Sequence, residues 1–235
     1  MIDLGSTDFY FDIPSLPRGE IEAYSNQLFD TWESYIAQET SLDDYALTLR
    51  VEEGSLKGKG AIFACVAALY GAIASYGTFI QGLQTIRSQS VSCGEYLAEK
   101  ARNLLGPNKV TPVVRKRTGA LGKIEKLFVR VQQREITAEE AMAETEKILG
   151  GEAATSPEFM SQLSKSLREV LLCPQQLTFL PMEENFFDPA SEKPDRKTSH
   201  RLPGPKPIIP SANQLRIEIW RESKRGKKKV RITER

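Results

Sequence analysis

The sequence predicts an α+β protein: a small mixed or antiparallel sheet of N-terminal strands and a C-terminal hairpin, covered by about six helices. Apolar and polar residues alternate over residues 45–53 and again over residues 215–220, which is typical of strands with one buried face. Between these segments, apolar residues recur at spacings of three and four, which predicts amphipathic helices. A long segment without charged residues predicts that one of the helices is central.

The N-terminal part of the chain predicts the order strand, helix, strand, helix. The aromatic-rich run 9–13 predicts the first strand, which Pro14 closes. Residues 45–53 predict the second strand, which the pair Gly54 and Ser55 ends. The helix between them is expected over residues 17–38, with one apolar face made of Ile21, Tyr24, Leu28, Phe29, Trp32, Tyr35 and Ile36.

The segment Gly60–Ile86 has 27 residues and no charged side chain, and it predicts a single helix buried on nearly all sides. Small residues at i, i+4 spacing would let another element approach closely; they are Gly60, Ala64, Ala68 and Ala72.

Two interpretations of this helix are open. As a membrane helix it exceeds the roughly 20 residues that cross a bilayer. It would then oligomerise through its small residues, lying in the inner membrane with its C-terminal side in the cytoplasm. As a core helix of a cytoplasmic protein it would bury the solidly apolar residues 61–74, whereas the polar residues scattered over 75–86 suit lipid poorly. We favour the core helix.

Residues 91–173 predict the helical portion of a domain that spans residues 1–180. Helices are expected over 93–105, 120–134 and 137–149, and from Ser156 onward. Thr137 and Glu140 have the spacing of a capping box, and Gly150 follows as a C-terminal stop. Ser156 and Pro157 suit the N-cap and first position of the last helix.

The C-terminal region predicts a connector followed by a hairpin. Residues 181–210 contain seven of the 13 prolines and no apolar periodicity, as expected of an extended connector. Residues 211–235 predict a basic β-hairpin whose turn includes Gly226. Neither this hairpin nor the N-terminal strands can bury an apolar face alone, so we expect the hairpin to dock on those strands.

Charge is distributed in alternating blocks, although the net charge is only +1. The net charges are −10 for residues 1–55, +10 for 56–134, −5 for 135–215 and +6 for 216–235. Such blocks either neutralise each other within the fold or meet partners of opposite sign. We favour internal neutralisation.

The residues that catalysis or metal binding would require are sparse. The three cysteines are widely spaced without a CxxC pair, which suits a reducing cytoplasm and argues against a zinc site. The single histidine, His200, falls in the connector, and no GxGxxG or GxxxxGK[ST] loop occurs. We therefore expect no enzyme activity, no cofactor and no metal.

Basic residues near the C-terminus are candidates for binding a polyanion such as nucleic acid. The candidates are Arg221, Lys224, Arg225, Lys227, Lys228 and Lys229, with Arg115, Lys116 and Arg117 as further members of one patch. The alternative is a solubilising turn that also protects a sheet edge from pairing.

The run 49–56, a strand followed by Gly-Ser and an apolar segment, loosely resembles a unit of uncharacterised bacterial proteins. Some of those proteins look like accessory components of conflict or phage-defence systems. The resemblance spans about residues 45–105 and implies a bacterial source and a partner-dependent, non-enzymatic role.

Three functional hypotheses follow from these expectations. The first is a non-catalytic interaction protein that acts through a protein partner. The second is a membrane effector that forms homo-oligomers through the segment 60–86, and the third is a polyanion-binding protein.

Overall fold

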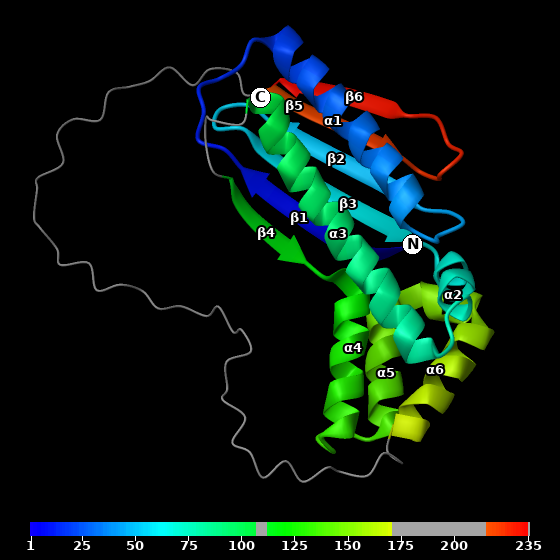
Figure 1. Ribbon diagram of the computed structural model, residues 1–235. Coiled ribbons are helices and arrows are strands. Elements are labelled where there is room, and N and C mark those ends of the chain that lie inside the picture. The colour runs from blue at the N-terminus through cyan, green and yellow to red at the C-terminus, as the bar shows by residue number, and fades with distance from the viewer. Residues whose placement is uncertain (107–111, 171–214, 235) are drawn as a thin grey trace, which may run out of the picture. The chain divides into compact units, whose positions relative to one another are not determined.

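The computed structural model describes residues 1–106, 112–170 and 215–234, and it confirms the α+β class (Figure 1). In chain order the elements are β1 (Ile2–Tyr10), α1 (Arg18–Glu39), β2 (Ala46–Glu52), β3 (Lys57–Ala64), α2 (Val66–Ala74), α3 (Phe79–Leu105), β4 (Val113–Arg117), α4 (Gly119–Gln132), α5 (Ala138–Leu149), the 3-10 helix η1 (Gly150–Thr155), α6 (Pro157–Val170), β5 (Leu215–Arg221) and β6 (Lys229–Glu234). The expected connector 181–210, with His200, and the third cysteine, Cys173, lie outside the described residues.

The six described strands form one antiparallel sheet in the order β4-β1-β3-β2-β5-β6. The expected docking of the C-terminal hairpin on the N-terminal strands is confirmed, because β5 pairs with β2 along six residues, Leu47–Glu52. The first strand, β1, overlaps the predicted strand 9–13 only at Phe9 and Tyr10: it begins at Ile2, and residues 11–13 are not part of it.

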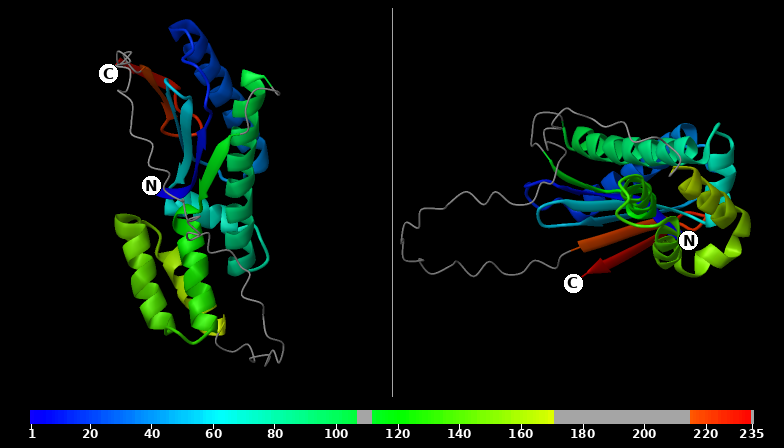
Figure 2. Two further views of the ribbon diagram at one scale, coloured as in Figure 1. Left: turned by 90° about the vertical axis from the view of Figure 1, so that its left-hand side faces the viewer. Right: turned by 90° about the horizontal axis from the view of Figure 1, so that it is seen from below.

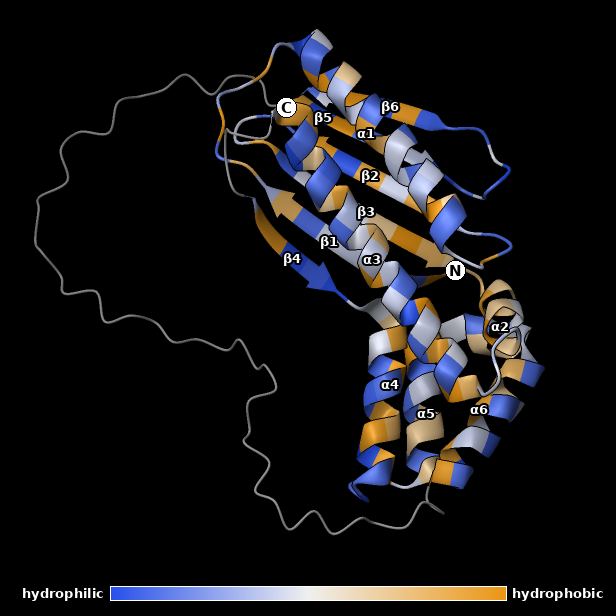
Figure 3. Cartoon of the chain, viewed as in Figure 1, coloured by the Kyte–Doolittle hydropathy of each residue, from blue (hydrophilic) through white to orange (hydrophobic). Residues whose placement is uncertain are grey.

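Helices α1 and α3 lie on the same face of the sheet and form its covering layer (Figure 2). Polar and apolar residues alternate along β2 in Figure 3, whereas the end of β3 is hydrophobic throughout. The covered face buries large rings, among them those of Phe9 and Trp32, which are at most 2% exposed. Trp32 also donates a hydrogen bond from its indole N–H to the Cys93 carbonyl on α3, 3.0 Å away, which joins the two covering helices.

Two glycines of β3 let these rings reach the sheet. A Cβ atom on Gly58 would lie 1.9 Å from the Phe9 ring, and one on Gly60 would lie 2.3 Å from Leu97 and 3.0 Å from Trp32. Gly58 and Gly60 therefore form the covered floor of the strand, while Lys57 and Lys59 alternate with them on the opposite face.

The predicted charge-free helix Gly60–Ile86 is wrong. The segment instead contains the end of β3, the short helix α2 and the first turns of α3, with a bend of 113° between the two helices. The strand residues are mostly buried, and burial excludes charged side chains from strands as well as from helices. In α2 only Val66, Leu69, Ala72 and Ile73 are buried, and most of the residues between α2 and α3 are exposed, so the expected burial on nearly all sides is also wrong. The Cys65 sulfur accepts a hydrogen bond from the Ala68 amide at the start of α2, and the Thr78 hydroxyl accepts one from the Gln81 amide at the start of α3.

The predicted helix-packing row is wrong for the same reason. Gly60 and Ala64 belong to β3, whereas Ala68 and Ala72 belong to α2, so the four residues share no helical face. Within the described ranges, no single helix has the length and apolar character to cross a membrane, and only the bent pair α2 and α3 passes such a test together.

Beyond one end of the sheet, α2, α4, α5 and α6 pack together around Phe159 (Figure 1). The Phe159 ring centroid lies 5.3 Å from that of Phe79 and 6.4 Å from that of Tyr70. The predicted capping box of α5 is confirmed: Thr137 Oγ1 accepts from the Glu140 amide at 3.2 Å, and Glu140 accepts from the Thr137 amide at 2.8 Å.

The joint between the sheet and these helices depends on Gly119. Its φ of +56° is one that side chains rarely adopt, and a Cβ there would lie 2.3 Å from the Asp3 carbonyl oxygen. Gly150 is a natural control because its φ is +57° and no atom lies within 4 Å of the place that a Cβ would take.

We expect Gly119→Ala to lower the free energy of unfolding by about 2–4 kcal/mol, because backbone atoms of β1 cannot yield easily to the added methyl group. Gly150→Ala has only the unfavourable backbone conformation, φ +57° and ψ −135°, to overcome and should cost less than Gly119→Ala, about 1–3 kcal/mol. Urea denaturation of both variants measures the difference. Equal losses would show that the close approach of Gly119 to β1 is not important.

Candidate functional site

The face of the sheet opposite α1 and α3 presents outward side chains in ordered rows. Antiparallel register sets residues of neighbouring strands directly opposite each other, so each row crosses all six described strands. We call this surface the open face. From β4 to β6, its central row reads Arg115, Asp8, Lys59, Arg50, Glu218 and Arg231.

Two further rows flank the central row, and each carries an aromatic residue. The Tyr10 row reads Val113, Tyr10, Lys57, Glu52, Arg216 and Thr233. The Trp220 row reads Arg117, Ser6, Ala61, Thr48, Trp220 and Lys229. The three rows together hold eight bases and three acids, so the open face has an excess of positive charge.

Ion pairs neutralise part of this charge. The distance from guanidinium to carboxylate is 2.8 Å for Arg50–Glu218, 2.6 Å for Arg216–Glu52 and 3.3 Å for Arg117–Asp8. All three acids of the rows are used in this way. Among the described residues, no ion pair is formed by Lys57, Lys59, Arg115 or Arg231.

Two of these four cations lie over the aromatic rings. Lys57 Nζ is 6.0 Å from the centroid of the Tyr10 ring, and the Arg231 guanidinium carbon is 5.5 Å from that of Trp220. Cations at such distances are attracted by the negative face of the ring. Tyr10 and Trp220, the aromatic residues of the two flanking rows, are thus each paired with a cation.

Lys59 and Arg50 lie directly opposite each other at the centre of the face. Like charges in cross-strand pairs destabilise a sheet. Asp8 lies opposite Lys59 and Glu218 lies opposite Arg50 in the same row. Glu218 pairs with Arg50 and Asp8 pairs with Arg117, so among the described residues Lys59 has no carboxylate within ion-pair distance. An anion bound at this point would relieve the repulsion.

The open face has two hollows that meet at this pair. The first has a volume of about 480 Å³ and lies beside Tyr10, Glu52, Lys57 and Arg115. The second has a volume of about 300 Å³ and lies beside Ser6, Phe63 and Trp220. Arg50 and Lys59 line both hollows.

Among the predicted basic residues of the C-terminal hairpin, Lys229 lies on the open face, at the end of the Trp220 row. The others lie outside the three rows, and several of them contact the acidic N-terminal block. Arg221 pairs with Glu33 at 2.8 Å and Lys228 with Asp30 at 2.7 Å, both on α1. The Lys224 amide donates to the Asp44 carboxylate at 2.8 Å, and Lys229 pairs with Glu222 at 2.7 Å. Arg225 and Lys227 are exposed in the turn.

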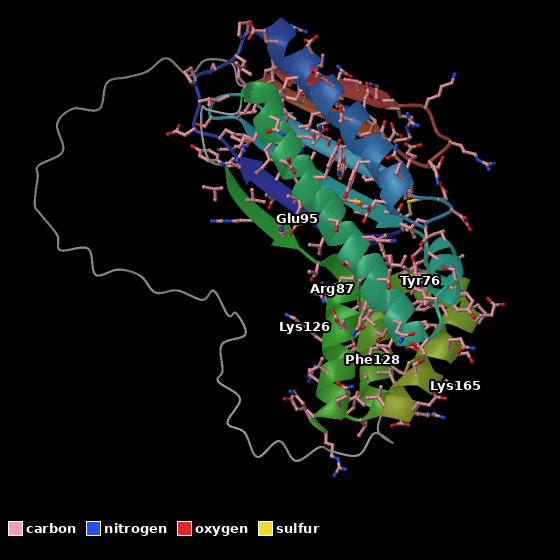
Figure 4. All side chains as sticks on the ribbon, in the orientation of Figure 1. Tyr76, Arg87, Glu95, Lys126, Phe128 and Lys165 are labelled. Carbon is pink, nitrogen blue, oxygen red and sulfur yellow. The ribbon has the colours of Figure 1, made fainter. Side chains whose placement is uncertain are left out.

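The predicted basic run Arg115–Arg117 forms β4, at the opposite edge of the sheet from the hairpin turn. The two groups therefore do not make one patch. Arg115 and Arg117 point to the open face, whereas Lys116 pairs with Glu95 of α3 on the covered side. Glu95 and Arg87, which pairs with Glu125 of α4, are labelled along α3 in Figure 4.

The aromatic residues and several cations of the open face are not among the candidates predicted from the sequence: Tyr10, Arg50, Lys57, Lys59, Trp220 and Arg231. The signal that was available is the alternation of Lys57 and Lys59 with Gly58 and Gly60, which reveals a strand with one charged face. The Gly54–Ser55 pair before it is the tight turn of the β2–β3 hairpin, with φ of +79° and +66°, and not the start of a helix.

Metal binding and thiol catalysis have little support among the described side chains. No group of three His, Cys, Asp or Glu residues in the described ranges is arranged to hold a metal ion. Burial raises the pKa of the Cys93 thiol to about 12, so it stays protonated at neutral pH.

The Arg221–Glu33 pair is the most enclosed contact between the hairpin and α1. The Glu33 side chain is 15% exposed, whereas that of Asp30, which pairs with Lys228, is 57% exposed. Burial raises the pKa of the Glu33 carboxyl, and the Arg221 guanidinium opposes this rise.

We expect Arg221→Met to lower the free energy of unfolding by about 2–4 kcal/mol at pH 7, because it leaves Glu33 buried and charged without its partner. Without Arg221 the pKa of Glu33 rises further. The loss should therefore shrink as the pH falls and Glu33 takes up a proton in the folded state.

Lys228→Met is the matched control and should cost less than about 1 kcal/mol, because its partner is solvated. Chemical denaturation at pH 7 and pH 4.5 measures both variants. Equal costs at pH 7 would show that burial of the Arg221–Glu33 pair does not matter to docking of the hairpin.

Comparison of the chain with protein-family models, with curated proteins and with solved structures gives no significant match.

Proposed function

We propose that this protein binds single-stranded nucleic acid on the open face of its sheet. The observation that carries the proposal is the pair Lys59 and Arg50, placed between two hollows that each contain an aromatic ring. The proposal keeps the non-enzymatic, partner-dependent role expected from the sequence and takes nucleic acid as the partner. It moves the polyanion site from the hairpin turn to the sheet.

The charges of the face suit a phosphate backbone. Lys57, Lys59, Arg115 and Arg231 have no carboxylate partner among the described residues, so they can neutralise phosphates without breaking an ion pair. Arg50 is held by Glu218 and still exposes half of its side chain. Binding here would release counterions, so affinity should fall steeply with salt.

The aromatic rings favour single strands over duplexes. A base can stack on Tyr10 or Trp220 only when it is unpaired and turned out of a helix. Stacking of this kind contributes about 1–3 kcal/mol per base and is tolerant of sequence. An acidic protein partner could use the same cations and rings. We favour nucleic acid because each ring lies beside a cation, which places a stacking surface next to a group that binds phosphate.

Lys59→Gln should weaken binding of single-stranded DNA or RNA and reduce the salt slope of log K by about 0.7, the value expected for one lost phosphate contact. The same change removes a like-charge repulsion with Arg50, so thermal stability should stay the same or rise. Fluorescence anisotropy at several salt concentrations and a thermal melt provide the two measurements.

Lys227→Gln is the matched control, because Lys227 is an exposed base in the hairpin turn and belongs to none of the three rows. It should leave affinity nearly unchanged. Loss of affinity in Lys227→Gln but not in Lys59→Gln would assign binding to the turn and overturn the proposal for the sheet.

Tryptophan fluorescence gives a direct probe of stacking. Trp220 lies on the open face, whereas Trp32 is 1% exposed beneath the helices, so only Trp220 should be quenched by a bound base. Trp220→Phe should bind with similar affinity but lose the quenching. Trp220→Ala should lose about 1–3 kcal/mol of binding free energy. Quenching that persists in Trp220→Phe would contradict this placement.

A further inference from the structure

We infer that the open face holds one nucleic-acid strand diagonally, with a base in each of the two hollows and the intervening phosphates on Arg50 and Lys59. This inference rests on the proposed function and assigns a path, a minimum length and separate roles to the residues along it. The path runs from Tyr10 on β1, across Lys59 on β3 and Arg50 on β2, to Trp220 on β5.

The register gives this path its direction. Tyr10 belongs to one flanking row and Trp220 to the other, while Lys59 and Arg50 lie together in the central row. The path therefore advances three strands across the sheet and four residues along it. With about 4.8 Å between strands and about 3.4 Å per residue, its length is about 20 Å. Several nucleotides are needed to cover that length.

The two hollows are distinct in shape and in the groups they offer. The first hollow is wide and has the Tyr10 ring beside Lys57 and Arg115, so a base that stacks on the ring has its phosphates close to cations. The second is narrower and has the rings of Phe63 and Trp220. Both have room for a single base.

A buried polar group points to a ligand in the second hollow. Ser6 lines it, is 6% exposed, and its hydroxyl has no hydrogen-bond partner among the described residues. An unsatisfied buried hydroxyl is costly, and a polar edge of a bound base would satisfy it.

The central pair is the part that both hollows share. Because Arg50 and Lys59 line each of them, a phosphate located there can link bases on the two sides. Glu218 holds the Arg50 guanidinium at 2.8 Å and limits its movement, so the cation is fixed in place before a strand arrives. Once one base of a strand is bound in the first hollow, a second base of the same strand is held near the second hollow at a high effective concentration. Binding in both hollows therefore raises the affinity of the strand.

The inference is tested with thymidine oligonucleotides of increasing length, from about 2 to about 12 nucleotides, with quenching of Trp220 as the signal. We expect short oligonucleotides to bind weakly at one hollow. Affinity should then increase by roughly 10-fold or more at the length that reaches both hollows, with little further gain beyond it.

Tyr10→Ala should remove this increase in affinity with length, which we call the step. The quenching and affinity of the shortest oligonucleotides should stay unchanged, because they still stack on Trp220. Tyr10→Phe keeps the ring and should restore the step, which separates stacking from damage to the fold. The far-ultraviolet circular dichroism spectrum and melting temperature of each variant show whether it is folded.

The outcomes separate the inference from the function on which it rests. If no oligonucleotide binds the natural protein, the proposed function is wrong. If oligonucleotides bind and quench Trp220, but the step is absent or survives unchanged in Tyr10→Ala, the function stands and the two-hollow path is overturned.

Discussion

The packing of Phe9 and Trp32 onto the two glycines of β3 is the contact on which the rest of the structure depends. Gly58 and Gly60 have no side chains, so the rings approach the backbone of a central strand directly and α1 and α3 can lie close to the sheet. The same alternation puts Lys57 and Lys59 on the other face. A single strand thus supplies both the floor of the core and the centre of the charged surface.

Local sequence signals predict the parts of the fold whose partners are near in the chain. The alternation of Leu47, Leu49 and Val51 predicts β2, and the Thr137–Glu140 pair predicts the start of α5; both are confirmed. The docking of the hairpin is also predictable, because neither the two short N-terminal strands nor the hairpin forms a stable sheet alone. No knowledge of distant contacts is needed for any of these predictions.

The predictions from the sequence that are wrong or missing concern residues whose environment is set by distant parts of the chain. Residues 60–64 are free of charge because they are enclosed within a central strand, and from composition alone this cannot be distinguished from a buried helix. The strand β4 consists of Val-Val-Arg-Lys-Arg at a sheet edge, so it has no apolar face to reveal it. The open face was not predicted because its rows exist only once six strands are in register, and no two neighbours in the Arg50–Glu218–Arg231 series are close in sequence.

The hairpin brings one more consequence, which concerns the order of synthesis. Glu53 and Leu215 join β2 to β5 although 162 positions separate them in the chain. Until the ribosome has made β5, the edge of β2 has no strand beside it, and Trp220 and Arg231 do not yet exist. An unfinished chain therefore has an unpaired edge that favours aggregation, and it holds only the Tyr10 half of the open face. Only a chain made through β6 carries the whole surface, so completion of the sheet and completion of the surface occur in the same step.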